Sequence, residues 1–482
     1  KNDNATSALK YYEKANELIG DKSPIKEHIA KSFIELNHLE KAFKILLRIL
    51  PLRNYRVDLV LMTSEALQNA TRIDEARDII KSAIKLHPNA EILYFKMGNI
   101  FKTQNIFSSA ITYYQKAIKI NADFYEAYSN LGNVYIDVGK YNSAIKALKK
   151  ALKLNKEQNY GKFSALLNLG NTEVTIKKFK EGWEKYEYRW KVDPGDKVVW
   201  PFKDKPLWDG KRASEVLLWR EQGIGDDIIF LGLVPEAYEK AGKDMTVLID
   251  PRLVAMCERS MPGIEFLPAV KGSVQEDRFD YHLPMGSLPR LFRGSEEDFS
   301  KTRESYLKAD MERVEVLRKE LGLEGKKVIG ISWKSFKSLN TTKKSMDLEQ
   351  FGRMFDGLDV VLLNLQYGDV NEEIRAFTKG TGIEVLQCSS VNLKEDLDGL
   401  GALIALCDLV VSTSNVTIHM AGAMGKEAWV LLPFAANFWW LIERTDSLWY
   451  PTVKLYRQKS LQDWSEILKV VRSDLDQRFE NQ

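Results

Sequence analysis

At 482 residues the chain is too long for one ordinary domain, and about three are expected. A hydrophobic fraction of 44% and a charged fraction of 28% are those of a globular protein that folds in water. The net charge of +3 excludes the strongly basic surface of a typical nucleic-acid-binding protein, so no nucleic-acid partner is expected.

Cysteine usage favours a reducing compartment. Cys257, Cys388 and Cys407 are odd in number and far apart in the sequence, which argues against a disulfide framework. We therefore predict a cytoplasmic protein. The most apolar stretch, residues 428–442, contains a proline and an asparagine and is too short to span a bilayer, so no membrane span is expected.

A resident metal or other cofactor is not expected. The five histidines are scattered, with only His282 and His419 in the C-terminal half. Asp396 and Asp398 have an Asp-x-Asp spacing, but they precede an apolar helical stretch and are interpreted as its N-cap region.

The N-terminal region repeats with a period of 34 residues. Two series share this spacing: Ala8, Ala42, Ala76, Ala110 and Ala144, and Ala15, Ile49, Ala83, Ala117 and Ala151. Gly98 and Gly132 follow the same period, and the next copy, at Gly170, is displaced by 38 residues. Small residues at fixed intervals predict paired antiparallel helices whose backbones cross closely and whose units stack into a solenoid.

The best-formed copy begins at Tyr125. Its Tyr-Glu-Ala-Tyr-Ser-Asn-Leu-Gly-Asn-Val-Tyr segment, followed by Gly139, Ala144 and Ala151, resembles the tetratricopeptide (TPR) consensus. The resemblance predicts an α-helical TPR solenoid over residues 1–190. It also implies a concave groove that binds a polypeptide, because TPR arrays have that role.

Asparagines recur on the first helix of successive units. They are Asn99, Asn133 and Asn171, each next to a repeat glycine, and the corresponding pair Asn130 and Asn168. Asparagine is a mediocre helix former, so its recurrence needs a reason. Two interpretations remain open: an amide ladder that hydrogen-bonds an acceptor peptide, and capping or hydrogen bonding within the repeats.

Residues 191–212 interrupt the helical pattern. Five prolines and glycines break any helix here, and Trp200, Phe202 and Trp208 add apolar surface. Aromatic residues are uncommon in free linkers, so we predict an ordered linker packed between the two halves.

After residue 212, short apolar runs alternate with helical stretches. The strand candidates are residues 216–219, 246–249, 328–333, 360–366, 409–412 and 428–432. Such alternation predicts parallel sheets covered by helices. We predict an α/β region of two Rossmann-like domains, at residues 213–322 and 323–455. Residues 456–482 are expected to hold a C-terminal helix that packs back on them.

The first strand runs into the segment Trp219-Arg-Glu-Gln-Gly-Ile-Gly-Asp-Asp. Gly223 and Gly225 allow a sharp turn, and the following helix start offers N–H groups to an anion. A third dinucleotide glycine is missing, since Ile228 lies three residues beyond Gly225. This argues against a nicotinamide cofactor, and an ordinary strand-to-helix turn is the alternative.

A second polar segment, residues 412–425, follows the strand at residues 409–411. Ser414, Asn415 and Thr417 supply short donors at a helix start, which is where a phosphate binds readily. Gly422 lets that helix approach its neighbours. The alternatives are a plain N-cap for Ser414 or Asn415 and a hydrogen-bonded core histidine for His419.

These two segments resemble the heptosyltransferase-like glycosyltransferases of the two-Rossmann-domain (GT-B) type. Their signature reads Asp-Thr-x-x-x-His-Leu-Ala; His419 and Ala421 match it, and Ser414-Asn415 replaces Asp-Thr. Residues 221–226 and 433–451 resemble blocks of bacterial TPR–glycosyltransferase fusions, among them flagellin-modifying protein O-glycosyltransferases. The resemblance implies a nucleotide-sugar as co-substrate.

A basic run follows the strand at residues 328–331. Lys334, Lys337, Lys343 and Lys344 lie in a stretch without acidic residues. Lysines at a strand end can neutralise phosphate, and a solvated basic loop is the alternative. Because lysines and helix N-termini can stabilise a leaving phosphate, no metal is required. Gln366 ends the next strand and is a candidate to read the nucleotide base.

The function we expect is transfer of a sugar, such as a nonulosonic acid or GlcNAc, from a nucleotide-sugar to Ser or Thr of a protein such as flagellin held by the TPR groove. The expected donor site comprises Gly223, Gly225, Lys334, Gln366, Ser414, Asn415, Thr417, His419 and Gly422. Asp226 matches the Gly-Asp of the family and is the first candidate base, with a simple N-cap of a helix that begins near Asp227 as the alternative. His282, expected in a loop facing the cleft, is the second.

Two other functions remain open from the sequence. One is a heptosyltransferase-like enzyme of surface glycan assembly, although a lipid acceptor does not require a peptide groove. The other is a non-catalytic TPR scaffold with a degenerate transferase domain, which the Ser414-Asn415 replacement allows.

Overall fold

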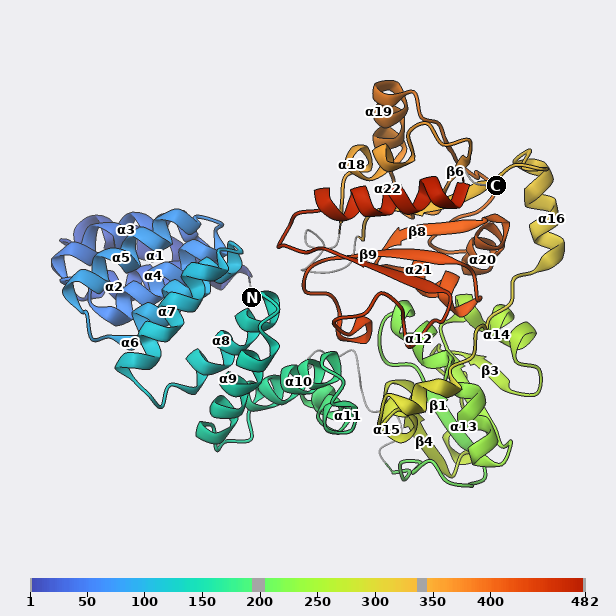
Figure 1. Cartoon of the computed structure of the whole chain (residues 1–482). Coiled ribbons are helices and arrows are strands. Elements are labelled where there is room, and N and C mark those ends of the chain that lie inside the picture. The colour runs from blue at the N-terminus through green and yellow to red at the C-terminus, as the bar shows by residue number, and fades with distance from the viewer. Residues whose placement is uncertain (1, 193–203, 336–344, 480–482) are drawn as a thin grey trace. The chain divides into compact units, whose positions relative to one another are not determined.

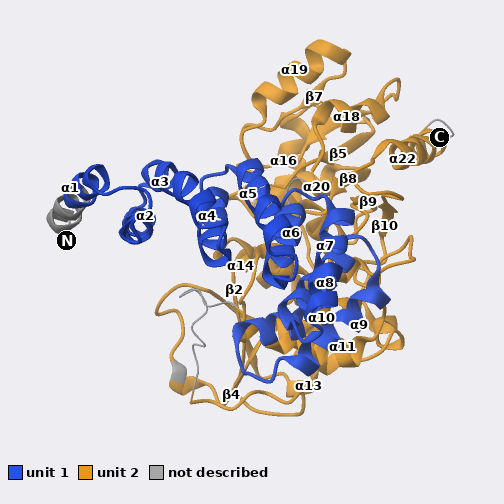
Figure 2. Cartoon of the chain, turned by 90° about the vertical axis from the view of Figure 1, so that its left-hand side faces the viewer, with its two compact units in different colours: residues 1–168 blue, residues 169–482 orange. Residues whose placement is uncertain are grey.

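A computed structural model describes residues 2–192, 204–335 and 345–479 (Figure 1). The chain divides into two units, residues 1–168 and 169–482, which Figure 2 colours separately. The sequence predicts the end of the repeat array at residue 190, whereas the division falls inside helix α10 (Tyr160–Thr175). The reason is that the last repeat helix packs on the α/β region.

The first unit is built of helices in the order that the 34-residue period predicts. They are α1 (Asn2–Leu18), α2 (Ile25–Glu35), α3 (Leu39–Leu52), α4 (Val57–Asn69), α5 (Ile73–Leu86), α6 (Glu91–Thr103), α7 (Phe107–Ile120), α8 (Tyr125–Asp137), α9 (Tyr141–Leu154) and the first part of α10. Contacts are most extensive within α6–α7 and α8–α9, the pairs that form single repeats. The prediction of a helical repeat array is confirmed.

Close helix crossings explain the periodic small residues. Ala42, Ala76, Ala110 and Ala144 are completely buried. A Cβ atom at Gly98 would lie 2.6 Å from the Tyr114 ring, so a side chain there would force the two helices apart.

The turn inside each repeat also follows the 34-residue period. Asn37, Thr71, Asn105 and Gly139 all adopt positive φ, between 58° and 69°. A left-handed residue ends the first helix of each pair and redirects the chain into the second. Glycine or asparagine fits this position without strain, and Thr71 shows that the repeat fold imposes it on other residues too.

The second unit begins with the rest of α10, then α11 (Phe179–Tyr186) and the 3₁₀ helix η1 (Glu187–Lys191). Gly170 and Gly182 meet where α10 and α11 cross, since a Cβ at Gly170 would lie 2.8 Å from the Gly182 carbonyl oxygen. Helix α11 contacts α15 (Leu288–Phe292) of the α/β region. We call α11 and η1 the cap.

The first sheet contains four parallel strands in the order β3-β2-β1-β4. These are β1 (Val216–Trp219), β2 (Met245–Ile249), β3 (Glu265–Pro268) and β4 (Tyr281–Pro284). The helices of this part are α12 (Ile224–Leu231), α13 (Val234–Ala241), η2 (Pro251–Leu253), α14 (Val254–Ser260), η3 (Glu276–Arg278), η4 (Met285–Ser287), α15 and η5 (Glu297–Lys301).

The second sheet contains six parallel strands in the order β10-β9-β8-β5-β6-β7. These are β5 (Val328–Ser332), β6 (Val361–Asn364), β7 (Val385–Leu386), β8 (Leu409–Thr413), β9 (Ala428–Leu432) and β10 (Val453–Arg457). The helices are α16 (Met311–Glu320), α18 (Leu348–Gly352), η6 (Arg353–Phe355), α19 (Asn371–Thr381), α20 (Leu397–Leu406), α21 (Val416–Ala423), η7 (Phe438–Trp440) and α22 (Ser465–Phe479). This strand order is that of a doubly wound Rossmann sheet.

Helix α22 packs on the second sheet (Figure 1). Its buried residues Val471 and Leu475 share one apolar cluster with Ile331 of β5 and Val411 of β8. The prediction that the chain ends in a helix packed back on the α/β region holds for this sheet.

Strands β3, β4, β7 and β10 were not predicted from the sequence. All four lie at the edges of the two sheets, and the partial exposure of β3 and β7 breaks their continuous apolar run.

Within the predicted linker, Trp200 and Phe202 lie outside the described residues. Trp208 is buried against Phe292, and its backbone N–H donates to the His282 carbonyl oxygen at 2.9 Å. This end of the linker is therefore packed on β4.

Candidate functional site

Both sheets reverse their strand order at a point where a polar segment follows a strand. In the second sheet the reversal lies between β5 and β8, and in the first between β1 and β4. Ligands of doubly wound sheets bind in the crevice outside the carboxyl ends of the strands at such a switch point. The two segments singled out by sequence, residues 219–227 and 412–425, follow β1 and β8.

Asn415 links β5 to β8 at the switch point of the second sheet. Its Nδ2 donates to the Ser332 hydroxyl at 2.7 Å, and its Oδ1 accepts the Thr417 backbone N–H at 3.0 Å. Asn415 is therefore the N-cap of α21, the alternative that the sequence left open, and Ser332 and Thr417 are buried around it.

Ser414 and Thr417 are also bonded within the protein. The Ser414 hydroxyl accepts the Trp440 indole N–H at 2.9 Å, and the Thr417 hydroxyl donates to the Leu365 carbonyl oxygen at 3.3 Å. Gly422 packs under Tyr450, whose Cγ lies 2.5 Å from where a glycine Cβ would be. Ser414 and Thr417 shape the start of α21, Gly422 lets the end of the helix pack under Tyr450, and any ligand would meet a preformed helix start.

Lys334 and Gln366 do not have the roles expected of them. The ammonium group of Lys334 forms an ion pair with Glu373, so its charge is already matched. Gln366 is 1% exposed; its Oε1 accepts the Ser332 hydroxyl and the Trp333 and Lys334 backbone N–H groups, and its Nε2 donates to the Tyr367 carbonyl. Gln366 thus fixes the loop after β5 and cannot read a base. Lys337, Lys343 and Lys344 lie outside the described residues.

The helix that follows the glycine turn after β1, α12, begins earlier in the sequence than expected. Gly223 is the N-cap of α12, and its N–H donates to Asp226 Oδ2 at 3.0 Å. Asp226 is at the third helical position and is partly exposed, whereas the sequence predicted a helix start near Asp227. Asp226 therefore combines a capping role with an accessible carboxylate.

Asp227, the next residue, is fully buried. Its carboxylate accepts from Arg220 Nε at 2.6 Å, and Arg220 also lies 3.3 Å from Asp250. Burial raises the pKa of Asp227 to about 8, with Asp226 and Asp250 adding to the rise and Arg220 opposing it. Asp227 is thus bonded to Arg220 in the protein interior, whereas Asp226 next to it is partly exposed.

The two polar segments meet at His419. A Cβ at Gly225 would lie 3.1 Å from His419 Cδ2, and α12 contacts α21. The imidazole is 6% exposed, stacks on Trp440 at 5.4 Å between centroids, and has its Nδ1 3.1 Å from the Tyr450 hydroxyl. His419 is therefore both a bonded core histidine and the point where the turn after β1 touches the helix after β8.

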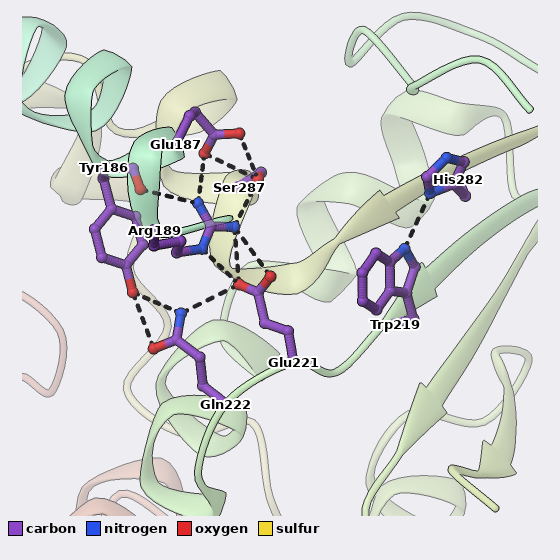
Figure 3. A network of polar contacts seen from close by, with 8 residues as sticks. All are labelled: Tyr186, Glu187, Arg189, Trp219, Glu221, Gln222, His282 and Ser287. Carbon is purple, nitrogen blue, oxygen red and sulfur yellow. Dashed lines mark hydrogen bonds and ion pairs between the residues drawn. The ribbon is translucent and has the colours of Figure 1, made fainter. Parts of the chain in front are cut away.

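His282 lies inside strand β4, so the prediction of a loop facing the cleft is wrong. Its side chain is 1% exposed, and its Nδ1 accepts the Trp219 indole N–H at 3.1 Å (Figure 3). A buried histidine bonded to a core tryptophan has no access to an acceptor hydroxyl. The short strand Tyr281–Pro284 is masked in sequence by its polar flanks, which is why His282 was assigned to a loop.

Arg189 of the cap is a functional candidate that sequence reasoning missed. Figure 3 shows its guanidinium between Glu187, Glu221 and Ser287, with contacts of 2.8 to 3.1 Å. The Tyr186 hydroxyl meets the Gln222 side-chain amide in the same network. Glu221 and Gln222 therefore hold the glycine turn onto the cap. No local motif indicates this contact, because Arg189 is 32 residues from Glu221 and Tyr186 is 36 residues from Gln222 in the sequence.

Three buried polar atoms near the strand carboxyl ends have no hydrogen-bond partner in the described part of the chain. They are Thr413 Oγ1 at the end of β8, Trp439 Nε1 in the loop after β9, and Gln458 Nε2 just after β10. Buried polar groups are normally paired, so such atoms mark a place for a ligand or water. In sequence, position after a predicted strand could have indicated Thr413 and Trp439, but not Gln458, because β10 was not predicted.

The repeat asparagines pair with one another between successive units. Asn130 Nδ2 donates to Asn99 Oδ1 at 2.8 Å, and Asn168 Nδ2 donates to Asn133 Oδ1 at 2.9 Å. Asn171 lies in the second unit, with its Oδ1 buried. Hydrogen bonds within the array thus use part of the hydrogen-bonding capacity of these half-buried amides. The peptide ladder remains a prediction.

The remaining expectations concern acidic pairs, metals and membranes. Asp396 is the N-cap of α20, accepting the Gly399 N–H at 2.8 Å, as predicted. No set of three or more His, Cys, Asp or Glu side chains placed to hold a metal occurs within residues 2–192, 204–335 and 345–479. Among the helices of those residues, none has the length and apolarity to cross a membrane.

Comparison with known proteins identifies the repeats. A family model described as tetratricopeptide repeat matches residues 125–158, and one described as TPR repeat matches residues 98–139. The chain therefore contains TPR repeats. A curated relative, Protein FlbA of Caulobacter vibrioides, is 27% identical over 493 residues, covering 97% of this chain and 81% of that protein.

Two similar solved structures each cover a little over a third of the chain. MamA 41-end from Desulfovibrio magneticus RS-1 is 20% identical and covers 36% of this chain and 94% of that chain, with a TM-score of 0.30. YrrB, described as a TPR protein with an unusual peptide-binding site, is 17% identical. It covers 38% of this chain and 93% of its own, with a TM-score of 0.31. Scores this low do not establish a common fold.

Proposed function

We propose that the chain is a GT-B protein O-glycosyltransferase acting in the cytoplasm. It transfers a sugar, such as a nonulosonic acid or GlcNAc, from a nucleotide-sugar to a Ser or Thr hydroxyl of a protein such as flagellin held by the TPR array. The observation that carries the proposal is the meeting of Gly225 and His419, which joins the polar segments after β1 and β8 into one site.

The donor binds on the second sheet. The N-terminus of α21 presents backbone N–H groups at the switch point, and the unpartnered Thr413 hydroxyl and Gln458 Nε2 lie at the carboxyl ends of β8 and β10 on the same sheet. All of these groups can donate hydrogen bonds, which suits phosphate and sugar oxygens. They stabilise the leaving phosphate without a metal, although Lys334 is engaged by Glu373.

Asp226 acts as the base. The acceptor hydroxyl oxygen forms a bond to the anomeric carbon while the bond from that carbon to the donor phosphate oxygen breaks, and the nucleotide leaves with the electron pair. The hydroxyl proton passes to the Asp226 carboxylate. Asp227 beneath it is tied to Arg220, so Asp226 alone of this pair is accessible.

The repeats supply the acceptor site. The matched relative Protein FlbA aligns over 97% of the chain, so its similarity extends through both the repeats and the α/β region. A peptide groove would serve a protein acceptor and has no use for a lipid-linked one. Capture of polypeptides by the full chain, lost on changing the asparagines of the array, would separate protein glycosylation from surface glycan assembly.

The decisive test is a transfer assay with purified full-length protein, a panel of UDP-, GDP- and CMP-sugars, and flagellin as acceptor. Intact-mass analysis of the acceptor should show the added mass of one sugar with one donor class. A donor that binds but is neither transferred nor hydrolysed would contradict the proposal.

A non-catalytic scaffold is the second candidate, because Asn415, Gln366 and Lys334 all bond within the protein. In that case no donor would be hydrolysed even in large excess. The Asp226→Asn variant and the wild type would then be indistinguishable in every assay that follows the nucleotide.

A further inference from the structure

The loop between β9 and β10, residues 433–451, is rich in aromatic residues that face two different parts of the second unit. We call it the aromatic loop. Phe438 and Trp449 lie against the cap: the Phe438 ring is 5.4 Å from Tyr186 and 5.9 Å from Trp183, and Trp449 is 6.3 Å from Trp183. Edge and tilted contacts at these separations are favourable aromatic geometries.

Two other aromatic residues of the loop, Trp440 and Tyr450, lie against the donor segment. Trp440 stacks on His419 with an interplanar angle of 17° and donates its indole N–H to Ser414. The Tyr450 hydroxyl lies 3.1 Å from His419 Nδ1. This loop thus provides both the ring stacked on His419 and the hydroxyl next to its Nδ1, and Gly225 lies next to its Cδ2.

Residues that face opposite ways are close neighbours in the loop. Phe438 and Trp440 belong to the same 3₁₀ turn, and Trp449 directly precedes Tyr450. A displacement of the ring on the cap side therefore moves the backbone that carries the ring on the His419 side. Sequence separations this short leave little chain to absorb the motion.

The loop is held in a strained conformation. Leu441 and Glu443 have φ of +46° and +55°, which non-glycine residues rarely adopt. Arg457 donates to the carbonyl oxygens of Trp440 and Leu441 at 3.1 and 2.6 Å. Strain of this kind persists only where surrounding contacts impose it, and here the cap supplies part of those contacts.

The cap is itself anchored to the first sheet domain. The Trp183 indole N–H donates to the Arg293 carbonyl oxygen at 2.9 Å, and Arg189 binds Glu221. The last repeat helix is therefore fixed on the first sheet domain, and the aromatic loop packs against it.

We infer that the aromatic loop is a positioning element that sets the orientation of His419 from the packing of the cap, with Phe438 and Trp449 acting through Trp440 and Tyr450. None of the four touches reacting atoms in this role. The consequence for nucleotide affinity rests on the proposed function, whereas the effect on His419 does not.

The experiment follows the His419 side chain by NMR in the full chain labelled with ¹³Cε1-histidine. There are five histidines, and the His419 signal is assigned by its loss in His419→Gln. Phe438→Leu should shift that signal in the same direction as Tyr450→Phe, which removes the hydroxyl next to Nδ1. Trp449→Phe, which keeps an aromatic ring, should produce a smaller shift and covers the case in which Phe438→Leu fails to fold.

The matched control is Phe355→Leu, which removes a buried ring from the core of the second sheet away from the loop. It should lower the melting temperature as much as Phe438→Leu and leave the His419 signal in place. If the signal is unmoved in both Phe438→Leu and Trp449→Phe while it moves in Tyr450→Phe, the inference is overturned. An equal shift in Phe355→Leu would also overturn it, since the effect would then be general loosening.

Nucleotide affinity gives an independent readout. Where the wild type binds UDP, GDP or CMP, Phe438→Leu should weaken that nucleotide on the order of fivefold and Phe355→Leu should not. Absence of nucleotide binding by the wild type counts against the proposed function, and the NMR comparison still decides the positioning role.

Discussion

The repeat array and the α/β region bury polar groups in different ways. In the described residues of the first unit, the fully buried polar side chains are few: Lys26, Thr63, Ser64 and Asn155. In the second unit they are numerous and concentrate after β5, β6 and β8, where Ser332, Gln366 and His419 belong to them. The array is held by small apolar contacts that recur every repeat, whereas many of the buried hydrogen bonds of the α/β region lie at the ends of β5, β6 and β8.

This difference predicts that stability and chemistry depend on different regions of the molecule. A polar group is costly to bury unless it is bonded, so a cluster of bonded polar groups at strand ends is retained for shape rather than for stability. Changes in the array should therefore affect folding and acceptor binding, and changes at the strand ends should affect the donor and transfer. Variants in each region show whether these two sets of effects are independent.

The largest effect is expected at the candidate base. Asp226→Asn keeps an oxygen to accept the Gly223 N–H but cannot take a proton, so transfer should fall on the order of 100-fold or more with nucleotide affinity nearly unchanged. Single-turnover transfer and calorimetry measure the two. Asp310→Asn, which changes the N-cap of α16, is the matched control and should retain transfer. Transfer by Asp226→Asn within a few-fold of wild type would remove Asp226 from the mechanism.

The next largest effect is expected from a substitution where two helices cross in the array. Gly98→Ala places a methyl group 2.6 Å from the Tyr114 ring and should destabilise the array by about 1–3 kcal/mol in urea unfolding. Gly161→Ala, whose nearest neighbour would be 3.5 Å away, should be neutral or stabilising. Nucleotide affinity should be the same in both variants. A loss of nucleotide affinity in Gly98→Ala would show that the two regions are coupled.

Acceptor binding should depend on the repeat amides. Asn99→Ala, Asn133→Ala and Asn171→Ala combined should weaken acceptor binding about tenfold, because each removes an amide from the first helix of a repeat. Binding of labelled acceptor to the full chain, with nucleotide affinity as control, measures this. If acceptor affinity holds while the melting temperature drops, the amides serve only the Asn99–Asn130 and Asn133–Asn168 pairs.

The smallest effect, taken per pH unit, is a pH dependence of stability that arises from Asp227. Burial raises its pKa from 3.8 to about 8, so the folded state holds a proton that the unfolded state releases, and stability falls as pH rises through that window. Asp227→Asn is neutral throughout and should flatten this slope by about 1 kcal/mol per pH unit between pH 5 and 8. Melting temperatures from pH 5 to 9 test it. A wild-type stability that stays parallel to that of the variant over this range would show that Arg220 keeps Asp227 ionised.

Periodic features of the chain could be predicted from sequence and single contacts could not. Ala76 and Gly132 repeat because every helix pair meets the same neighbour one unit away, so local pattern and tertiary packing coincide. The strands around residues 216, 328 and 409 are likewise continuous apolar runs. The structure confirms them because burial on both faces leaves no polar alternation.

The sequence predicted where the candidate site lies, but the roles of several of its side chains were predicted wrongly. Gly225 and His419 were chosen because they follow strands, and the topology brings them together. Gln366 and Lys334 were expected to face a ligand, but their partners Ser332 and Glu373 are 34 and 39 residues away in sequence. Arg189 was missed for the same reason. Side-chain direction at a strand end is decided by such distant partners, which no local pattern encodes.

The central claim is that the turn after β1 and the helix after β8 form one nucleotide site. Isothermal titration calorimetry of the full chain with UDP, GDP, CMP and ADP tests it most directly, using Gly225→Ala and Gly380→Ala as a pair. A Cβ at Gly225 would crowd His419 at 3.1 Å, and one at Gly380 meets nothing within 4 Å. We predict that one nucleotide binds the wild type and Gly380→Ala equally and binds Gly225→Ala about tenfold more weakly. Equal affinity in all three proteins, or no binding to any, would contradict the claim.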